Sequence, residues 1–220
     1  MTTAVGIIGA GGFGREILEY VADAADDGAD LEVAGFFDDR SDARAGFGDE
    51  HPILGGLADV EHSRLDGYVV ALGDAGLRRS VARQLAAWGR TLTSVVHPTA
   101  HVSRSAKIWP GAVLCPFTLV GPHAVVGRNL SLNCYGSIGH DSVIGDDCVV
   151  SPYVAITGTV RLGDACFLGT HVTVAPGVEI GGFSKVMAGS FVHRDAPAGS
   201  LLTGSPAKGR VMFRAAGEDD

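Results

Sequence analysis

His140 and Asp141 are adjacent in the sequence, and their side chains have the chemistry of a general-base pair. A carboxylate beside an imidazole can fix the tautomer of the ring and leave its second nitrogen free to accept a proton. A solvent-exposed turn also tolerates histidine without any catalytic role, and adjacent side chains often diverge. The pair by itself therefore leaves both catalysis and simple solvation open.

A glycine-rich turn, Gly9-Ala10-Gly11-Gly12-Phe13-Gly14, is the second stretch that could bind a ligand. An apolar run over residues 4–9 predicts a buried strand before the turn, and residues 15–25 predict an amphipathic helix after it. In this context a GxGxxG sequence binds phosphate, because glycine lets the backbone approach the ligand and a helix N-terminus favours negative charge. The residues expected to hold the phosphate are Gly11, Gly12 and Gly14.

A second predicted strand, residues 31–37, ends in Asp38 and Asp39. A carboxylate at this position can accept hydrogen bonds from a ribose or a base. The alternative is a tight turn whose glycines serve packing, followed by a solvated acidic pair.

The rest of the N-terminal part continues the same alternation. Residues 52–57 indicate a loop, residues 67–72 a third strand that ends at Gly73 and Asp74, residues 77–88 a helix and residues 91–96 a fourth strand. Residues 1–96 thus predict a small Rossmann-like parallel α/β domain with Gly73 and Asp74 near the ligand. Only one mononucleotide-sized half is present, which fits a nucleotide or a nucleotide sugar better than NAD.

From Val102 to Val192, every sixth residue is Val, Ile or Leu, without exception. A period of six fits neither a helix nor a lone strand, and it predicts short parallel strands stacked as a β-solenoid. Glycine often follows the aliphatic residue, which we interpret as a corner that needs unusual backbone angles. Small side chains four residues after it are expected to point inward. In this phase His140 and Asp141 lie at a corner.

Composition limits the possible functions. The formal net charge is −8 and no basic cluster is present, which argues against nucleic acid and anionic membranes as partners. With neither a signal peptide nor a long apolar span, the chain is expected to be soluble and cytoplasmic. Cys115, Cys134, Cys148 and Cys166 form no CxxC pair, so we expect no metal site. Cys148 and Cys166 are eighteen residues apart and are expected to be reduced core residues on adjacent coils, with a nucleophilic cysteine as the alternative.

The whole arrangement resembles one acetyltransferase family. The likeness rests on the glycine turn, the Asp-Asp strand end, the joint Val96-His97-Pro98, the hexapeptide series and the tail Gly204-Ser205-Pro206-Ala207-Lys208. Members of that family N-acetylate nucleotide-linked amino sugars, and close relatives O-acetylate sialic acid. The resemblance implies a left-handed parallel β-helix over residues 97–196, with three hexapeptides to a coil, and a C-terminal tail over residues 197–220. Residues 215–220 are expected to be a frayed acidic end.

The resemblance also implies roles for individual residues. His140 would be the general base, Asp141 would orient it, and Asn133 would touch the sugar. Acetyl-CoA would be the co-substrate, and no metal would be needed. The family is homotrimeric, so each active site would lie between two subunits and would use the nucleotide sugar held by an N-terminal domain. The pantetheine arm of acetyl-CoA would run near Gly158, Gly169 and Gly189.

This sequence departs from some members of the family at Val149, where those members have a second histidine. Three other readings remain at this stage: O-acetylation of sialic acid or another sugar, a non-catalytic nucleotide-binding assembly module, and an NAD-dependent enzyme. A γ-type carbonic anhydrase uses the same solenoid but needs a pair of histidines five residues apart. The residue five positions after His140 is Gly145, so this sequence lacks that pair at His140.

Overall fold

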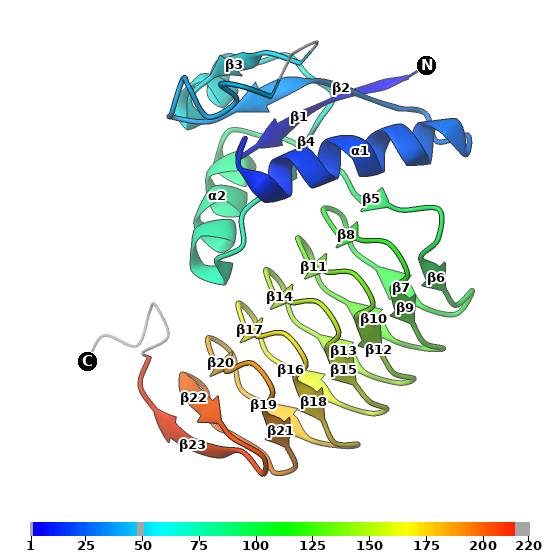
Figure 1. Ribbon diagram of the computed structural model, residues 1–220, viewed down its shortest axis with the longest axis vertical. Helices are drawn as coiled ribbons and strands as arrows, with labels where there is room; N and C mark the ends of the chain where they lie inside the picture. Colours follow the sequence, from blue (N-terminus) through cyan, green and yellow to red (C-terminus); the bar gives the residue numbers. More distant parts are fainter. Residues whose placement is uncertain (1, 48–50, 214–220) are drawn as a thin grey trace.

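The computed structural model describes residues 2–47 and 51–213, which form an α/β domain on top of a long β-solenoid (Figure 1). The α/β domain has a parallel sheet in the strand order β3-β2-β1-β4. Its strands are β1 (Thr3–Ile8), β2 (Leu31–Phe37), β3 (Ile53–Gly55) and β4 (Gly67–Val70). Its helices are α1 (Gly12–Asp26), the 3₁₀ helix η1 (Leu57–His62) and α2 (Ala75–Ala87).

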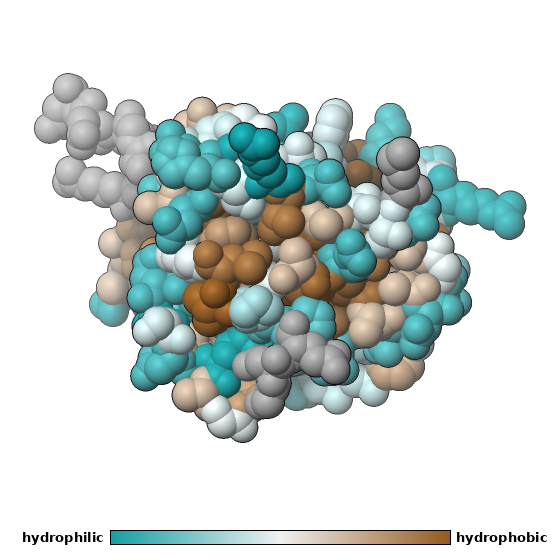
Figure 2. Space-filling view, turned by 90° about the horizontal axis from the view of Figure 1, so that it is seen from above, coloured by the Kyte–Doolittle hydropathy of each residue, from teal (hydrophilic) through white to brown (hydrophobic). Residues whose placement is uncertain are grey.

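Helices cover both faces of this sheet, which explains why its central strands are apolar on both sides. Helix α1 packs Ile17 and Val21 against β1, while α2 and η1 pack against the opposite face with Val81 and Val60. The predicted Rossmann-like arrangement is therefore confirmed. The outer surface of the domain, away from the solenoid, carries apolar patches among hydrophilic side chains (Figure 2).

Two details of the prediction for this domain were wrong. The segment expected to be a loop contains β3, which pairs with β2 as an edge strand. The strand expected over residues 91–96 is divided, because Leu92 forms only a bridge with Tyr68, whereas Val95–Val96 (β5) pairs with the solenoid. Strand propensity alone could not tell which of the two sheets would receive this segment.

Three parallel sheets make up the left-handed β-helix, and the chain visits them in the fixed order 1, 2, 3. Sheet 1 contains β6 (His101–Val102), β9 (Leu119–Val120), β12 (Ser137–Ile138), β15 (Ala155–Ile156), β18 (Thr173–Val174) and β21 (Phe191–Val192). Sheet 2 contains β7 (Lys107–Ile108), β10 (Val125–Val126), β13 (Val143–Ile144), β16 (Arg161–Leu162) and β19 (Glu179–Ile180). Sheet 3 contains β5, β8 (Val113–Leu114), β11 (Ser131–Leu132), β14 (Val149–Val150), β17 (Phe167–Leu168), β20 (Lys185–Val186), β22 (Ser200–Thr203) and β23 (Lys208–Val211).

Every aliphatic residue of the period-six series ends one of these two-residue strands and points into the solenoid. Each strand pairs with the strand eighteen residues later, as in Ile138 with Ile156, so that side chains of one column stack along the axis. The small residues four positions after the series are buried as well, for example Cys148 and Cys166. The hexapeptide pattern therefore encodes the core directly.

The role expected for the glycines at the corners was wrong. The residue with positive φ is the third after the aliphatic one, and it is usually not glycine, as in Asp141 (φ 57°) and Tyr153 (φ 59°). The glycine directly after the aliphatic residue has no positive φ. A Cβ on Gly121 would lie 2.8 Å from the backbone nitrogen of His140, so this position is glycine because adjacent coils approach closely.

The segment expected to be a C-terminal tail adds two strands to the solenoid. Strand β22 pairs in parallel with β20, and β23 pairs antiparallel with β22 at the edge of sheet 3. The acidic end expected at residues 215–220 lies outside the described residues. Within the described part of the chain, no helix has the length and apolar character needed to span a bilayer.

The α/β domain contacts sheet 3 and the two corners that border it. Helix α1 lies over the first coils, where His97 Nε2 is 2.9 Å from Asp23 Oδ2 and Tyr20 packs edge-on against the His97 ring. Helix α2 lies along the corner between sheets 2 and 3, which we call corner 2–3. The corner between sheets 1 and 2, corner 1–2, carries His140, and corner 3–1 lies between sheets 3 and 1.

Candidate functional site

His140 and Asp141 form the expected pair at corner 1–2. His140 Nδ1 lies 2.8 Å from Asp141 Oδ2, and both side chains are more than half exposed. The positive φ of Asp141 turns its carboxylate back toward the preceding ring, so that the two side chains converge. With the proton on Nδ1 facing the carboxylate, Nε2 carries the free lone pair that a general base needs.

Gly158 lies beneath the imidazole of His140, one coil further along the same corner. A Cβ on Gly158 would overlap with Nε2, Cε1 and Cδ2 of the ring. Because φ of Gly158 is not positive, the backbone itself does not require glycine here. The imidazole occupies the space that a side chain at residue 158 would fill. Gly158, which was expected to contact the cofactor, therefore lies beside the expected base.

The glycine turn opens into a pocket of about 370 Å³ at the carboxyl ends of β1 and β2. Gly14 is needed for packing, since its Cβ would overlap with the carbonyl oxygen of Gly9. Gly11 and Gly12 differ, because a Cβ there would meet only the ends of the Arg40 and Arg15 side chains, 3.9 and 4.0 Å away. The packing of the chain does not explain why these two residues are glycine.

Asp38 and Asp39 face this pocket, but their carboxylates already have partners. Asp38 accepts hydrogen bonds from the Ala10 backbone N–H (2.9 Å) and from Arg40 Nε and Nη2 (3.0 and 2.9 Å). The hydrogen bonds from Arg40 are the main cause that lowers the pKa of Asp38 to about 2. Asp39 accepts from the Leu57 N–H (2.9 Å). The two carboxylates therefore stabilise the backbone around the pocket, and the charged group that is exposed there is Arg40.

Gly73 and Asp74 lie at the start of α2. No atom of residues 2–47 or 51–213 comes within 4 Å of the position of a Cβ on Gly73, so this glycine also leaves space among the described residues. Asp74 caps α2 by accepting the Leu77 N–H at 2.9 Å, and its second oxygen lies 3.9 Å from Lys185 Nζ on sheet 3. The segment after β4 therefore rests on sheet 3.

The remaining predicted site residues lie at corner 3–1. Asn133 Oδ1 accepts a weak hydrogen bond from the Cys115 thiol (3.9 Å), near Tyr20 of α1. Gly169 packs against the backbone of Ala188, and Gly189 has a positive φ of 71°. The structure thus brings Gly158 to His140, but places Asn133, Gly169 and Gly189 at another corner of the same chain.

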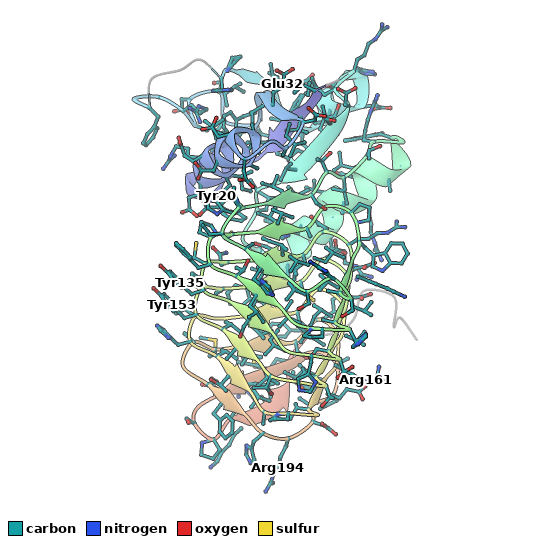
Figure 3. The ribbon with its side chains drawn as sticks, turned by 90° about the vertical axis from the view of Figure 1, so that its right-hand side faces the viewer. Tyr20, Glu32, Tyr135, Tyr153, Arg161 and Arg194 are labelled. Atoms are coloured by element: carbon teal, nitrogen blue, oxygen red, sulfur yellow. The ribbon has the colours of Figure 1, made fainter. Side chains whose placement is uncertain are left out.

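Three features were missed from the sequence. Arg15 and Arg40 flank the glycine turn, and Arg78 is fully buried between the domains. The third feature is a column of stacked rings at corner 3–1, which we call the aromatic column. Its rings are 4.9–5.0 Å apart, and Tyr135 and Tyr153 project outward from one edge of the solenoid, opposite Arg161 (Figure 3). The spacing of eighteen between its members was a readable signal: Phe117, Tyr135, Tyr153 and His171.

The cysteines are free thiols, and burial raises the pKa of Cys115, so this thiol stays protonated. In the Cys148 and Cys166 pair, the neighbouring thiol and burial raise the pKa of Cys148. Neither group has the low pKa of a nucleophilic cysteine. Among the described residues, no three His, Cys, Asp or Glu side chains lie close enough together to hold a metal ion.

Comparison with known proteins identifies both halves of the chain. Residues 4–85 match the family described as the PglD N-terminal domain. No curated protein sequence matches the chain at a significant level. The acetyltransferase domain of PglB from Neisseria gonorrhoeae FA1090 is similar to it with 28% sequence identity and a TM-score of 0.85, over 94% of this chain and 99% of that domain.

A second similar structure is PerB from Caulobacter crescentus, solved in complex with CoA and GDP-perosamine. It has 30% identity and a TM-score of 0.85, over 96% of this chain and 98% of PerB. A histidine-to-asparagine mutant of perosamine N-acetyltransferase from the same organism matches equally well. Because this identity extends over nearly the full length of both chains, the chain belongs to the hexapeptide-repeat sugar N-acetyltransferase family that includes perosamine N-acetyltransferase and the PglB acetyltransferase domain.

Proposed function

We propose that this protein transfers the acetyl group of acetyl-CoA to the amine of a nucleotide-linked amino sugar, with His140 as the general base. One observation carries the assignment of the base: His140 is paired with Asp141 through Nδ1, and its ring lies over a residue without a side chain. This arrangement fixes the tautomer and leaves Nε2 without a neighbouring side chain on that side. The relative that binds CoA and GDP-perosamine supports the substrate class.

In the proposed reaction, the sugar amine attacks the thioester carbonyl carbon, and Nε2 of His140 takes the proton that the nitrogen loses. Asp141 stabilises the imidazolium that forms, because its carboxylate faces Nδ1. The tetrahedral intermediate then breaks its C–S bond. The leaving thiolate takes the proton from Nε2, which gives CoA as a free thiol, the N-acetylated sugar and the neutral histidine.

The nucleotide belongs at the pocket beside the glycine turn. Gly11, Gly12 and Gly73 leave space that the packing of the chain does not need. The first turn of α1 offers backbone N–H groups to a phosphate, since its N-cap is Gly11, which has no side chain to cap the helix. Arg15 adds positive charge next to these N–H groups, and Arg40, which is paired with Asp38, adds an exposed guanidinium.

We further propose that each active site is completed by a second copy of the chain in a homotrimer. His140 lies at corner 1–2, whereas the nucleotide pocket belongs to a domain that rests on sheet 3 and corner 2–3. Within the described residues, no contact joins the pocket to His140. The two halves of the reaction therefore meet only if the pocket of one subunit faces corner 1–2 of another.

Sheet 1, which borders His140, offers a suitable contact surface for that second copy. Its outward residues carry no Asp, Glu, Lys or Arg, and two of them are large and exposed apolar side chains. The corresponding residues of sheet 2 include Lys107, Arg161 and Glu179. Interface cores are depleted of charged residues, which favours sheet 1. Its outward residues are His101, Leu119, Ser137, Ala155, Thr173 and Phe191.

A panel of acceptors tests the proposed reaction. Purified protein is incubated with acetyl-CoA and with UDP-, GDP- or dTDP-linked amino sugars, and release of the CoA thiol is followed together with the mass of the product. We expect a gain of one acetyl group on at least one amino sugar. Sialic acid and a nucleotide sugar without an amine form the O-acetylation arm. Acetylation of those hydroxyls alone would contradict the proposed acceptor, and no transfer to any compound would contradict the enzyme assignment.

A further inference from the structure

Arg78 is a fully buried arginine in α2 that connects the nucleotide pocket to the solenoid. Its Nη1 donates to the carbonyl oxygens of Val70 (2.5 Å) and Leu72 (3.3 Å), at the end of β4. Its Nε and Nη2 donate to the carbonyl oxygen of Asn129 at corner 2–3 (3.2 and 2.8 Å). One planar guanidinium thus spans both domains.

Arg78 lies in a hydrogen-bonded network in which no carboxylate of the described residues pairs with it directly. Nη2 also donates to Asn129 Oδ1 (2.8 Å), and Asn129 Nδ2 donates to Asp147 Oδ1 (2.9 Å) and back to the Arg78 carbonyl (3.3 Å). The guanidinium charge is therefore balanced by carbonyl dipoles and, one residue further, by Asp147. Burial lowers the pKa of Arg78 to about 10, which still leaves it charged at neutral pH.

A chain with no functional need for this contact would more simply bury an apolar side chain. A buried charge is costly to desolvate, and replacing buried ionic groups by apolar residues is often neutral or stabilising. A guanidinium that donates to several carbonyl oxygens is held in one orientation, because its donors lie in a rigid plane. An apolar side chain forms no directional bonds and cannot fix the geometry in this way. The feature that this network fixes must therefore be sought at its two ends.

One end of the network is a wall of the nucleotide pocket. Leu72 lines that pocket together with Gly9, and a Cβ on Gly9 would lie 2.9 Å from the Ala71 carbonyl oxygen, so the glycine turn rests on the segment that Arg78 holds. Gly73 and Asp74 follow at once. The other end, Asn129, is a corner residue with a φ of 56° in the rigid stack of the solenoid.

Part of the contact between α2 and corner 2–3 is not closely packed. A cavity of about 450 Å³ lies between them, lined by the outward face of α2 and by Arg128, Asp146 and Asp164 of the solenoid. Arg79, the next residue, reaches across to Asp164 at 3.5 Å and lies over the Phe183 ring at 4.8 Å. At the start of α2, Ala75 packs in a small apolar cluster with Val149 and Ala165. The packed contact on this side is therefore small, and Arg78 adds a directional link between the domains that apolar packing does not supply.

We infer that Arg78 is a positioning residue, which holds the nucleotide pocket at a fixed place relative to the solenoid through Leu72 and Asn129. This inference rests on the proposed function, in which a pocket on one subunit must present its sugar to His140 of another. His140 lies on the solenoid of one subunit, and the nucleotide pocket is attached to the solenoid of the other. A change in the angle between the two domains of a subunit therefore displaces the sugar from the base. Acetyl-CoA, which we place on the solenoid, would not be affected.

The test compares Arg78→Lys and Arg78→Met with Arg79→Met as the matched control. A lysine keeps the charge but has one nitrogen in place of three, so it cannot reproduce the separate bonds that Nη1 makes to β4 and that Nε and Nη2 make to Asn129. We expect Arg78→Lys to raise KM for the nucleotide sugar about 10-fold, with KM for acetyl-CoA changed less than about 2-fold, and Arg79→Met to leave both within about 2-fold. Hydrogen exchange should become faster at residues 70–74 and stay unchanged in the strands of sheets 1 and 2.

A merely structural role predicts something else. In that case both KM values and the melting temperature would change together, or lysine would restore normal kinetics, and either result would overturn the inference. Should Arg78→Met fail to fold, Asn129→Gly provides the second variant. Glycine accepts the positive φ of Asn129 and keeps its carbonyl, but it removes the side chain that Arg78 bonds. We expect it to raise KM for the nucleotide sugar about 3-fold, and an unchanged value would count against the inference.

Binding of GDP and UDP, measured by titration calorimetry, separates this inference from the reaction. If the wild type binds one of these diphosphates but acetylates no acceptor, the proposed function fails, whereas weaker binding to Arg78→Lys than to Arg79→Met still supports the role of Arg78. Equal binding to both variants overturns that role. A wild type that binds neither diphosphate overturns it as well, because the pocket would then not be a nucleotide site.

Discussion

His140 lies against Gly158, and the imidazole occupies the space that any side chain at residue 158 would fill. The two residues are eighteen apart, so they occupy the same corner on successive coils. Ser142, in the coil of His140, ties this coil to that of Gly158, since its Oγ donates to the Thr157 carbonyl and accepts the Val160 N–H. The position of the proposed base is therefore set by the repeat as much as by Asp141.

Replacement of Gly158 by alanine should reduce activity without unfolding the protein. The added methyl group overlaps with the imidazole, and the exposed ring can rotate away into solvent, which breaks its alignment with Asp141. We expect kcat to fall about 10-fold or more, because an acid–base group that loses its position gives up part of its 10²–10⁴-fold contribution. The melting temperature should change little.

Gly189→Ala is not a suitable control here, because φ of Gly189 is positive and alanine would be strained. Gly73→Ala adds a methyl group that neither packing nor φ opposes, but Gly73 lies beside the proposed nucleotide pocket. This variant should therefore raise KM for the nucleotide sugar and leave kcat near the wild-type value, which distinguishes it from Gly158→Ala. If Gly158→Ala kept normal kcat while its crystal structure showed the ring displaced, His140 would not be the base.

Loss of the base itself should have the largest effect. We expect His140→Ala to lower kcat by about 10²–10⁴-fold. Asp141→Asn keeps a side chain that tolerates the positive φ at this corner, but it removes the carboxylate that faces Nδ1, so kcat should fall at least about 10-fold. Steady-state kinetics with the acceptor found in the panel gives both values. His123→Asn, at the same corner one coil earlier, should retain wild-type turnover, because asparagine tolerates the positive φ of this position. Turnover near wild type in His140→Ala would instead exclude the proposed mechanism.

The sequence predicted the solenoid well because its signal is local and repeated. Every aliphatic residue from Val102 to Val192 occupies an inward position, and the same phase placed His140 and Asp141 at a corner. The reason for the glycines could not be predicted, because the sequence does not show whether a glycine is needed for a positive φ or for a close approach between coils. Gly121 and Gly145 serve the approach, while Asp141 and Tyr153 take the positive φ.

What the sequence could not give is the relation between the domains. Arg78 and Asn129 are fifty-one residues apart, and nothing in either segment marks the other as a partner. The same holds for Asn133, expected at the sugar but placed near Cys115 and Tyr20 at corner 3–1. Contacts of this kind depend on how α1 and α2 dock on sheet 3, and a pattern within one element does not determine that docking.

The pairing of Asp38 predicts a specific dependence of stability on pH. The folded protein holds the pKa of Asp38 at about 2, below its ordinary value of 3.8, chiefly through Arg40. A lowered pKa stabilises the folded state above the unfolded-state value, and this contribution is lost as the pH falls toward the folded-state value. The shift corresponds to about 2 kcal/mol at pH 7, and about half of it should be lost by pH 3.

Asp38→Asn should therefore unfold at lower urea concentration than the wild type at pH 7, and the difference should shrink between pH 5 and pH 3. Arg40→Ala should reproduce most of the effect, because it removes the main cause of the shift. A difference that stayed constant over this pH range would show that Asp38 acts through the shape of the turn and not through its charge.

The assembly of the protein should depend on sheet 1. Ala155 is half-buried, points outward from the middle of that sheet, and has Ser137 and Thr173 as its neighbours. Ala155→Arg places an uncompensated charge at the centre of the proposed contact, where its desolvation would be costly. Sedimentation velocity should show a trimer for the wild type and a smaller species for the variant, with a matching loss of acetyl transfer.

Val125→Arg is the matched control, because Val125 is the outward residue of a strand in sheet 2 and is also half-buried. That variant should remain trimeric and active. If Val125→Arg dissociated the protein and Ala155→Arg did not, the contact would lie on sheet 2. A wild type that sediments as a monomer while it acetylates its acceptor would remove the need for a second copy, and His140 and the nucleotide pocket would then have to meet within one chain.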